Sequence, residues 1–238
     1  MTSSHCVLLA GGLGTRLTEI TGGLKPKALV EVGGIPFLHF KLLSLIQMGF
    51  TSTDILIGQH GDQIEQFIAN GSYSDISIRC FRDGPTLLGT AGAIASILDN
   101  LPTTFWISYA DTFVIADINQ ANKNFRNEED SIMVVLHNQD RVETSNVSID
   151  TVNDYVVEYV KNPPLGTHEW IDYGILRLTK VCFTSITRDN PADLREVILS
   201  QIEAKCLRAF QTKELFWDIG TPDRLQETTQ EFQRRGWV

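Results

Sequence analysis

The chain has 238 residues, which suits one large or two small domains, and its 42% of apolar residues is ordinary for a globular protein with a sizeable core. The formal net charge is −9 and no long basic run is present, which argues against nucleic acid as the main partner. The four cysteines are scattered without a C-x-x-C pair, so neither a zinc site nor a disulfide framework is expected.

The sequence carries no signal for secretion or for a membrane. Its first residues lack the basic and apolar regions of a signal peptide, and no apolar run approaches the ~20 residues of a membrane span. Scattered cysteines are most simply interpreted as reduced thiols. We therefore expect a cytoplasmic protein with no membrane partner.

The first half of the chain alternates strand and helix patterns. The predicted strands are Cys6–Ala10, Asp54–Gly58, Ile76–Phe81 and Thr104–Tyr109, and the predicted helices are Pro36–Met48, Asp62–Ile68 and Thr90–Leu98. This order is typical of an α/β fold in which helices cover both faces of a parallel sheet.

The second half is richer in strands. The predicted strands are Ser131–His137, Asn146–Asp150, Tyr155–Val160 and Trp170–Leu178, and the predicted helices are Pro191–Ala204 and Pro222–Arg235. Asn153-Asp154 marks a turn between two of the strands. We expect this half to form an antiparallel part that closes over a site on the same compact domain.

A glycine-rich loop follows the first predicted strand. Gly11, Gly12 and Gly14 have no Cβ, so the chain can turn tightly there and present N–H groups to an anion. Arg16 lies two residues past the last glycine, and Lys27 lies eleven residues further on. A glycine loop with two cations is what a polyphosphate requires.

The loop differs from two better-known glycine motifs. The third glycine of a Rossmann fingerprint is replaced by Leu17, and the chain contains no Gly-Lys-Ser/Thr of a Walker A loop. A glycine-rich turn without a ligand is the structural alternative.

Three short segments together resemble the N-terminal signature of the sugar-1-phosphate nucleotidyltransferases, the nucleotide-sugar pyrophosphorylases. They are Gly-Gly-x-Gly-Thr-Arg, Pro-Lys-Ala-Leu-Val and Val-Gly-Gly-x-Pro-Phe. Within this family the chain is similar to small single-domain members, such as heptose-1-phosphate guanylyltransferases and N-acetylmuramate-1-phosphate uridylyltransferases.

The resemblance implies the nucleotide-diphospho-sugar transferase fold. This fold has a Rossmann-like, mixed and mainly parallel sheet with helices on both faces and an antiparallel sugar-binding portion. We expect a single domain over residues 1–238, in which a nucleotide-binding part covers about 1–115 and an acceptor-binding and closing part covers about 116–238.

The resemblance also assigns roles in binding the nucleotide. Arg16 is expected to hold the β- and γ-phosphates, and Lys27, on the family's Pro-Lys-Pro lysine, to lie at the α-phosphate, although Ala28 replaces the second proline. The other nucleotide-binding residues expected are Ala10, Gly11, Gly12, Gly14 and Thr15, with Gly89 and Thr90 from a second glycine turn against the nucleobase. For that second turn, close packing of a helix on a sheet is the alternative.

Two aspartates are expected to hold Mg²⁺. Asp111 ends an apolar strand, where sites form in parallel sheets, and it resembles the family's Gly-Asp metal motif with Tyr109-Ala110 in place of Asn-Gly. Asp218 lies in a segment similar to the family's Trp-x-Asp-x-Gly-Thr, so the resemblance implies that it completes the site. The alternatives are a turn or cap role for Asp111 and a helix start at Thr221-Pro222 for the second segment.

The acceptor pocket departs from the family pattern. The family's Glu-Lys pair falls on Lys161 and Asn162, which do not match it, so those roles do not transfer. Lys161 could still reach the sugar phosphate from a neighbouring position, although a surface lysine is the alternative. Gly174 matches the glycine of the family's Asn-Ala-Gly, whereas Asp172 and Tyr173 do not match its first two residues. The acceptor is therefore not expected to be handled as in glucose-1-phosphate thymidylyltransferases.

The resemblance implies a Mg²⁺-dependent enzyme that joins a nucleoside triphosphate to a sugar 1-phosphate and releases pyrophosphate. One alternative is a cytidylyltransferase acting on a non-sugar phosphate such as phosphocholine. Another is a non-catalytic regulatory subunit that binds nucleotide sugars. Loss of the charged residues would mark such a subunit, and here they are all present: Arg16, Lys27, Asp111 and Asp218. The nucleobase, the acceptor and the oligomeric state, a homo-oligomer included, are left open.

Overall fold

The protein is described by a computed structural model that covers residues 5–12, 14–84, 86–124, 130–138, 143–188 and 190–238. These residues form two compact units, each assembled from separate segments of the chain. Among the described residues, the N-terminal unit comprises 5–87, 108–115 and 216–238, and the central unit comprises 88–107 and 116–215. The C-terminal segment, residues 216–238, therefore groups with the start of the chain.

Three parallel strands form the sheet of the N-terminal unit. They are β1 (His5–Ala10), β4 (Ser52–Ile57) and β5 (Ser77–Arg82), in the order β5-β4-β1. Both faces of β1 are buried in its first half, where Cys6, Val7 and Leu8 are inaccessible to solvent. Burial on both faces explains why this strand has a continuous apolar run rather than an alternating pattern.

Two short ladders complete the strands of this unit. One joins β2 (Glu31–Val32) to β3 (Ile35–Pro36), and the other joins β7 (Thr112–Phe113) to β13 (Trp217–Asp218), both antiparallel. The helices of the unit are α1 (Thr18–Thr21), α2 (Phe37–Gln47), α3 (Gly61–Asn70) and α7 (Pro222–Arg234), with 3₁₀ turns at Thr15–Leu17 and Lys27–Leu29.

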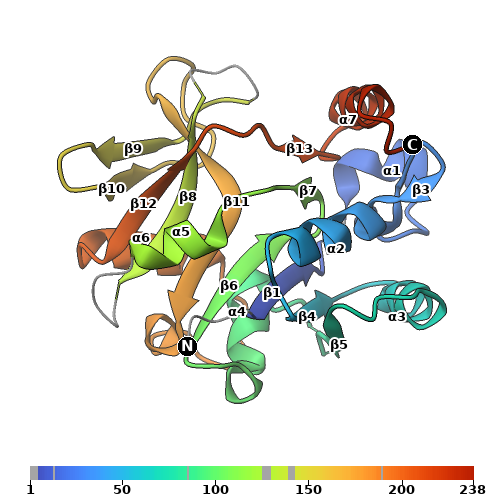
Figure 1. Cartoon of the computed structure of the whole chain (residues 1–238). Helices are drawn as coiled ribbons and strands as arrows, with labels where there is room; N and C mark the ends of the chain where they lie inside the picture. Colours follow the sequence, from blue (N-terminus) through green and yellow to red (C-terminus); the bar gives the residue numbers. More distant parts are fainter. Residues whose placement is uncertain (1–4, 13, 85, 125–129, 139–142, 189) are drawn as a thin grey trace. The chain divides into compact units, whose positions relative to one another are not determined.

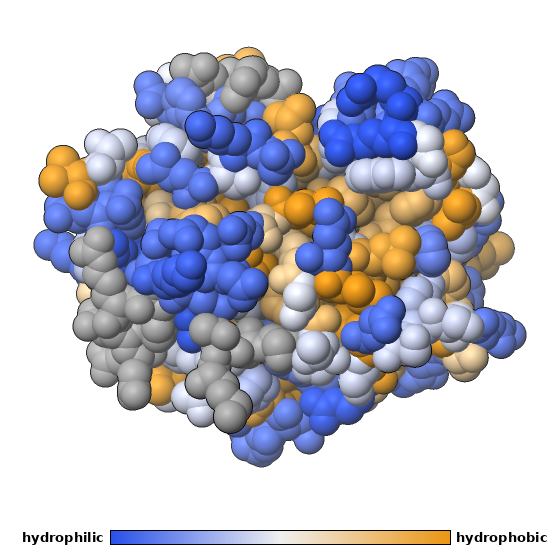
Figure 2. Space-filling view, in the orientation of Figure 1, coloured by the Kyte–Doolittle hydropathy of each residue, from blue (hydrophilic) through white to orange (hydrophobic). Residues whose placement is uncertain are grey.

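Helix α7 begins where the sequence predicted. The Thr221 side chain accepts a hydrogen bond from the Arg224 main-chain N–H, and Pro222 occupies the first turn. Apolar side chains reach the surface over α2, where Leu43 is exposed (Figure 2). The outer face of α7, in contrast, is hydrophilic. The inner face of α7 is therefore the one that packs.

An aromatic core anchors α7 to its own unit. Phe232 is fully buried, and its ring centre lies 4.9 Å from that of Phe40 and 5.2 Å from that of Phe113. Ile219 belongs to the same cluster. Phe113 follows Asp111 by two residues and Ile219 follows Asp218 directly, so this core fixes the segments that carry both aspartates.

The central unit has a mixed sheet in the order β6-β11-β8-β12-β10-β9, in which β12 runs parallel to β8 and β11 antiparallel to it. The strands are β6 (Thr104–Tyr109), β8 (Ser131–His137), β9 (Val147–Asp150), β10 (Tyr155–Tyr159), β11 (Trp170–Thr179) and β12 (Leu207–Thr212). Only the first four residues of β6 belong to this unit, since Ser108 and Tyr109 belong to the N-terminal unit.

The helices of the central unit are α4 (Gly89–Ser96), α5 (Ile118–Lys123) and α6 (Leu194–Glu203), with 3₁₀ turns at Leu98–Asn100 and Lys180–Phe183. Helix α6 starts at Leu194 rather than at Pro191, because Asp193 forms a capping box with Glu196. Figure 1 follows these elements along the chain. Within the described residues, none of the helices has the length and apolar character that crossing a membrane requires.

Replacing Phe232 tests whether α7 is part of the core of the N-terminal unit. Phe232→Ala is expected to lower the free energy of unfolding by about 3–5 kcal/mol, because it empties the centre of an aromatic cluster. Urea denaturation measures the change. Gln230→Ala, on the exposed side of the same helix, is the control and should stay within about 0.5 kcal/mol of wild type. Equal stability of both variants would contradict this packing.

Candidate active site

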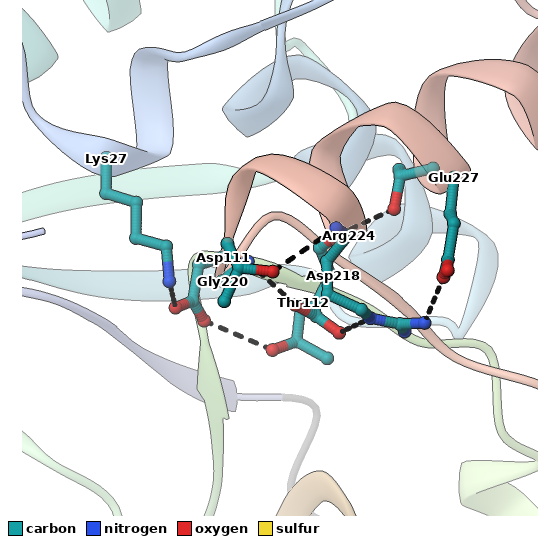
Figure 3. Close-up of polar contacts among 9 residues, drawn as sticks. Lys27, Asp111, Thr112, Asp218, Gly220, Arg224 and Glu227 are labelled. Carbon is teal, nitrogen blue, oxygen red and sulfur yellow. Dashed lines mark hydrogen bonds and ion pairs between the residues drawn. The ribbon is translucent and has the colours of Figure 1, made fainter. Parts of the chain in front are cut away.

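Lys27 and Asp111 form the closest charged contact of the site. Lys27 begins the 3₁₀ turn after Pro26, and its Nζ donates a hydrogen bond to Asp111 Oδ2 at 2.5 Å (Figure 3). The other oxygen of Asp111 accepts a hydrogen bond from Thr112 Oγ1 at 3.1 Å. About a third of the Asp111 side chain remains exposed (32%), so its carboxylate is accessible to a ligand.

Asp218 is held by two donors from the start of the last helix. The Gly220 main-chain N–H donates to its Oδ1 at 2.7 Å, and Arg224 Nε donates to its Oδ2 at 2.8 Å (Figure 3). Arg224 also pairs with Glu227. Both oxygens of Asp218 are therefore oriented by groups of the protein itself.

The ladder of β7 and β13 brings the two aspartates together. Asp218 pairs with Thr112, the residue after Asp111, and the Ile219 main-chain N–H donates to the carbonyl oxygen of Asp111 at 3.1 Å. Two carboxylates this close repel each other unless cations compensate them. In this structure Lys27 compensates Asp111, and Arg224 compensates Asp218.

Gly220 lies where three charged side chains meet. A Cβ atom at this position would lie 2.8 Å from Asp218 Oδ1, 3.8 Å from Lys27 Nζ and 3.9 Å from Arg16 Nη2. Arg16, from the first 3₁₀ turn, thus comes close to the same point as Asp218 and Lys27. The absence of a side chain at Gly220 leaves room there for a small ligand group.

The glycine loop lies beside Lys27. Gly14 has a φ of +61°, and a Cβ there would lie 3.3 Å from the Cβ of Lys27, so a larger residue would be strained and crowded. Nothing lies within 4 Å of the Cβ position of Gly12, and Gly11 approaches Gly58. Leu13 lies outside the described residues. Phosphate binding by this loop, with Ala10 and Thr15, stays a prediction.

The expected base-binding residues make structural contacts within the central unit. Gly89 has a φ of +67°, and a Cβ there would lie 2.5 Å from the Ala192 carbonyl oxygen. Thr90 Oγ1 accepts a hydrogen bond from the Leu194 main-chain N–H at 2.7 Å. Close packing of two helix starts therefore accounts for both residues, and a contact with the nucleobase remains a prediction.

The expected acceptor residues also lie in the central unit. Lys161 is exposed and lies 3.6 Å from Asp193. Gly174, with a φ of +81°, donates its N–H to Asp172 Oδ1 at 2.9 Å. Burial raises the pKa of Asp172 to about 6, against the effect of that hydrogen bond. The structure thus explains Gly174 by its backbone conformation, and its role toward an acceptor stays a prediction.

The acidic pair fits a magnesium ion that shares its coordination with a substrate. Asp111 and Asp218 supply hard carboxylate oxygens, which Mg²⁺ prefers, and Mg²⁺ commonly takes only one or two carboxylates and fills its other positions with phosphates and water. Among the described residues, no cluster of three or more histidine, cysteine or acidic side chains could form an all-protein site. The donor set therefore favours a metal brought or completed by phosphates.

Arg224 is a residue of this cluster that the sequence motifs did not indicate. A cation in the first turn of a helix opposes the helix dipole, so an arginine there indicates a carboxylate partner nearby. Asp218, six residues earlier, is that partner. The pairing depends on the turn at Gly220 and so could not be found from helical spacing.

Residues 5–235 match the profile of the nucleotidyl transferase family, and the chain therefore belongs to this family of enzymes. Members act on nucleoside triphosphates and sugar phosphates and generally use a divalent metal ion. Membership confirms the resemblance, the enzyme class and the fold class that the motifs predicted.

Curated relatives and solved structures agree with this assignment. The chain is 25% identical over 237 residues to the UTP–glucose-1-phosphate uridylyltransferase AglF of Haloferax volcanii, covering 96% of each chain. It is 36% identical over 92 residues to the N-acetylmuramate alpha-1-phosphate uridylyltransferase of Neisseria meningitidis, covering 39% of each. The crystal structure of HddC from Yersinia pseudotuberculosis complexed with GMP-PN has a TM-score of 0.83 at 24% identity, covering 96% of this chain and 99% of that one.

Adding one methyl group at Gly220 tests the space between the charged groups. Gly220→Ala is expected to lower turnover about 100-fold, because the new Cβ would displace the Asp218 carboxylate and a small displacement of an aligned group is enough. Steady-state kinetics and urea denaturation measure activity and stability. Gly84→Ala, where nothing lies within 4 Å of the Cβ position, is the control. Normal kinetics in Gly220→Ala would show that this space is not used.

Proposed function

We propose that this chain joins a nucleoside triphosphate to a sugar 1-phosphate, giving a nucleotide sugar and pyrophosphate, with the help of Mg²⁺. The observation that carries the proposal is the cluster around Gly220. There Arg16 and Lys27, which suit phosphate oxygens, lie beside Asp218, and Lys27 contacts Asp111. Cations next to paired carboxylates are what a metal-assisted reaction of a triphosphate requires.

The reaction needs positioning and charge neutralisation rather than a base. An oxygen of the acceptor phosphate attacks the α-phosphorus in line, and the bond from that phosphorus to the oxygen bridging to the β-phosphate breaks. The attacking oxygen is already anionic, so no proton has to be removed. Fixed donors and cations placed where charge develops then supply the acceleration.

Lys27 changes partner when the triphosphate binds. In the structure its ammonium group is paired with Asp111. Phosphate oxygens replace Asp111 as its partner, so Lys27 neutralises the α-phosphate while Asp111 becomes available as a ligand. Arg16 holds the β- and γ-phosphates together with main-chain N–H groups of Gly11, Gly12 and Gly14.

Asp111 and Asp218 would hold the metal, which supplies Lewis-acid neutralisation of the phosphate charge when bound. Asp218 is oriented for this role by the Gly220 N–H and by Arg224. Arg224 stays on Asp218 as a lasting counter-charge, whereas the Lys27 contact with Asp111 is the exchangeable one. The two aspartates thus have different tasks. Asp218 is a fixed metal ligand, whereas Asp111 becomes a metal ligand once Lys27 has turned to the phosphates.

The substrate class follows from the relatives, and the individual substrate does not. AglF is named for UTP and glucose 1-phosphate, and the Neisseria protein for N-acetylmuramate 1-phosphate. Both names describe transfer to a sugar 1-phosphate, which favours a sugar acceptor over phosphocholine. The presence of all four charged residues favours an enzyme over a regulatory subunit.

Lys27 is expected to be the most sensitive single residue. Lys27→Ala should lower turnover by about 100-fold or more, the usual scale for one preorganised charge, because charge at the α-phosphate is left uncompensated. Lys25→Ala is the matched control, since Lys25 makes an exposed ion pair with Glu31, and it should keep normal turnover. Equal kinetics of the two variants would remove Lys27 from the mechanism.

Ligand panels identify the substrates. The correct nucleoside triphosphate with Mg²⁺, at 100 times its Kd, should stabilise the protein by ~2.7 kcal/mol and raise Tm by about 5–10 °C. EDTA in place of Mg²⁺ should abolish most of the shift. Pyrophosphate release is then measured with sugar 1-phosphates and with phosphocholine as the control acceptor. Binding without turnover across the whole panel would favour the regulatory subunit instead.

A further inference from the structure

Lys41 is a buried cation that the proposed chemistry does not use. It lies within α2, and its side chain is fully inaccessible to solvent. In the part of the chain that the structure describes, it forms no ion pair with a carboxylate. Burying an ammonium group is unfavourable unless hydrogen bonds and nearby opposite charge compensate it. The partners of Lys41 therefore indicate why a lysine is present.

Both partners of the ammonium group lie on the segment that carries Asp111. Lys41 Nζ donates to Ser108 Oγ and to the Thr112 carbonyl oxygen, each at 2.8 Å. Ser108 lies near the end of β6 and Thr112 begins β7, so Lys41 joins the two ends of the turn that contains Asp111. Helix α2 runs beside β7 (Figure 1), which brings the lysine to this turn.

The charge of Lys41 acts on the same turn. Burial lowers the pKa of Lys41 to about 8, while Cys6 and Asp111 act in the opposite direction. Asp111 is thus close enough to attract the ammonium group, although it is not a hydrogen-bond partner. An apolar side chain of similar length would fill the space without burying a charge, but it would remove the two hydrogen bonds that Lys41 donates to Ser108 and Thr112.

We propose that Lys41 is a positioning residue, which fixes the turn from Ser108 to Thr112 and so keeps Asp111 aligned with Lys27. The inference rests on the proposed function of Asp111. Because Thr112 also pairs with Asp218 across β7 and β13, the same ammonium group supports the ladder that brings the two aspartates together. Lys41 acts through the turn and does not touch the substrates.

The test compares Lys41→Met with Lys41→Gln, which keeps a donor. Each is assayed for turnover and for Mn²⁺ affinity, the latter by electron paramagnetic resonance with the nucleoside triphosphate that gives the largest thermal shift. Lys41→Met should lower turnover and Mn²⁺ affinity by about 10–100-fold, the usual loss when a group that orients a metal ligand is removed. Lys41→Gln should lose less, because its amide can donate to the same two oxygens.

Asp54→Asn is the control for loss of a buried charge. Asp54 is fully buried in the same unit. It pairs with His5 and Arg79, which lie outside the turn from Ser108 to Thr112. It should lose stability in urea but keep turnover and Mn²⁺ affinity within about 2-fold. The inference is overturned if Lys41→Met keeps both properties, or if Asp54→Asn loses them equally, since general loosening would then explain the effect.

Two further variants keep the test decisive. If Lys41→Met does not fold, Ser108→Ala removes one acceptor and leaves the lysine, and a lowered Mn²⁺ affinity supports the inference whereas an unchanged one overturns it. Asp111→Asn separates the two proposals. If Asp111→Asn has normal turnover and Mn²⁺ affinity, the proposed function of Asp111 fails. If it loses both while Lys41→Met is normal, only the inference about Lys41 fails.

Discussion

The pairing of β7 with β13 is the constraint on which the site depends. Each strand has two residues, and between them they bring Asp111 and Asp218 from distant parts of the sequence to one place. A ladder this short is not stable alone. Phe113 on one strand and Ile219 just after the other belong to the core around Phe232. Hydrophobic packing therefore determines where the acidic pair lies.

Charge balance then explains the polar residues around the pair. Each aspartate has its own cation, Lys27 in one case and Arg224 in the other. Neighbouring counter-charges therefore offset the repulsion between the two carboxylates. In the proposed function, phosphate oxygens would replace Asp111 as the partner of Lys27, and the metal would compensate the carboxylate that Lys27 leaves.

The sequence predicted the elements that have a clear pattern and missed those that depend on tertiary pairing. Apolar runs identified most strands, and Thr221-Pro222 identified the start of α7. Strand β12 was missed because Arg208 and Gln211 interrupt its apolar residues, and two-residue strands have no period to detect. For the site, the family-like motifs pointed to the charged residues, but the contact of Arg224 with Asp218 arises only once the chain has turned at Gly220.

The grouping of residues 216–238 with the start of the chain has a consequence for biosynthesis. Residues 5–87 are synthesised before residues 216–238, so the aromatic cluster of the N-terminal unit lacks Phe232 until that later segment has been made. The central unit, whose residues end at 215, can acquire all of its own strands before that moment. The order of synthesis thus delays assembly of the charged cluster until residues 216–238 have been made.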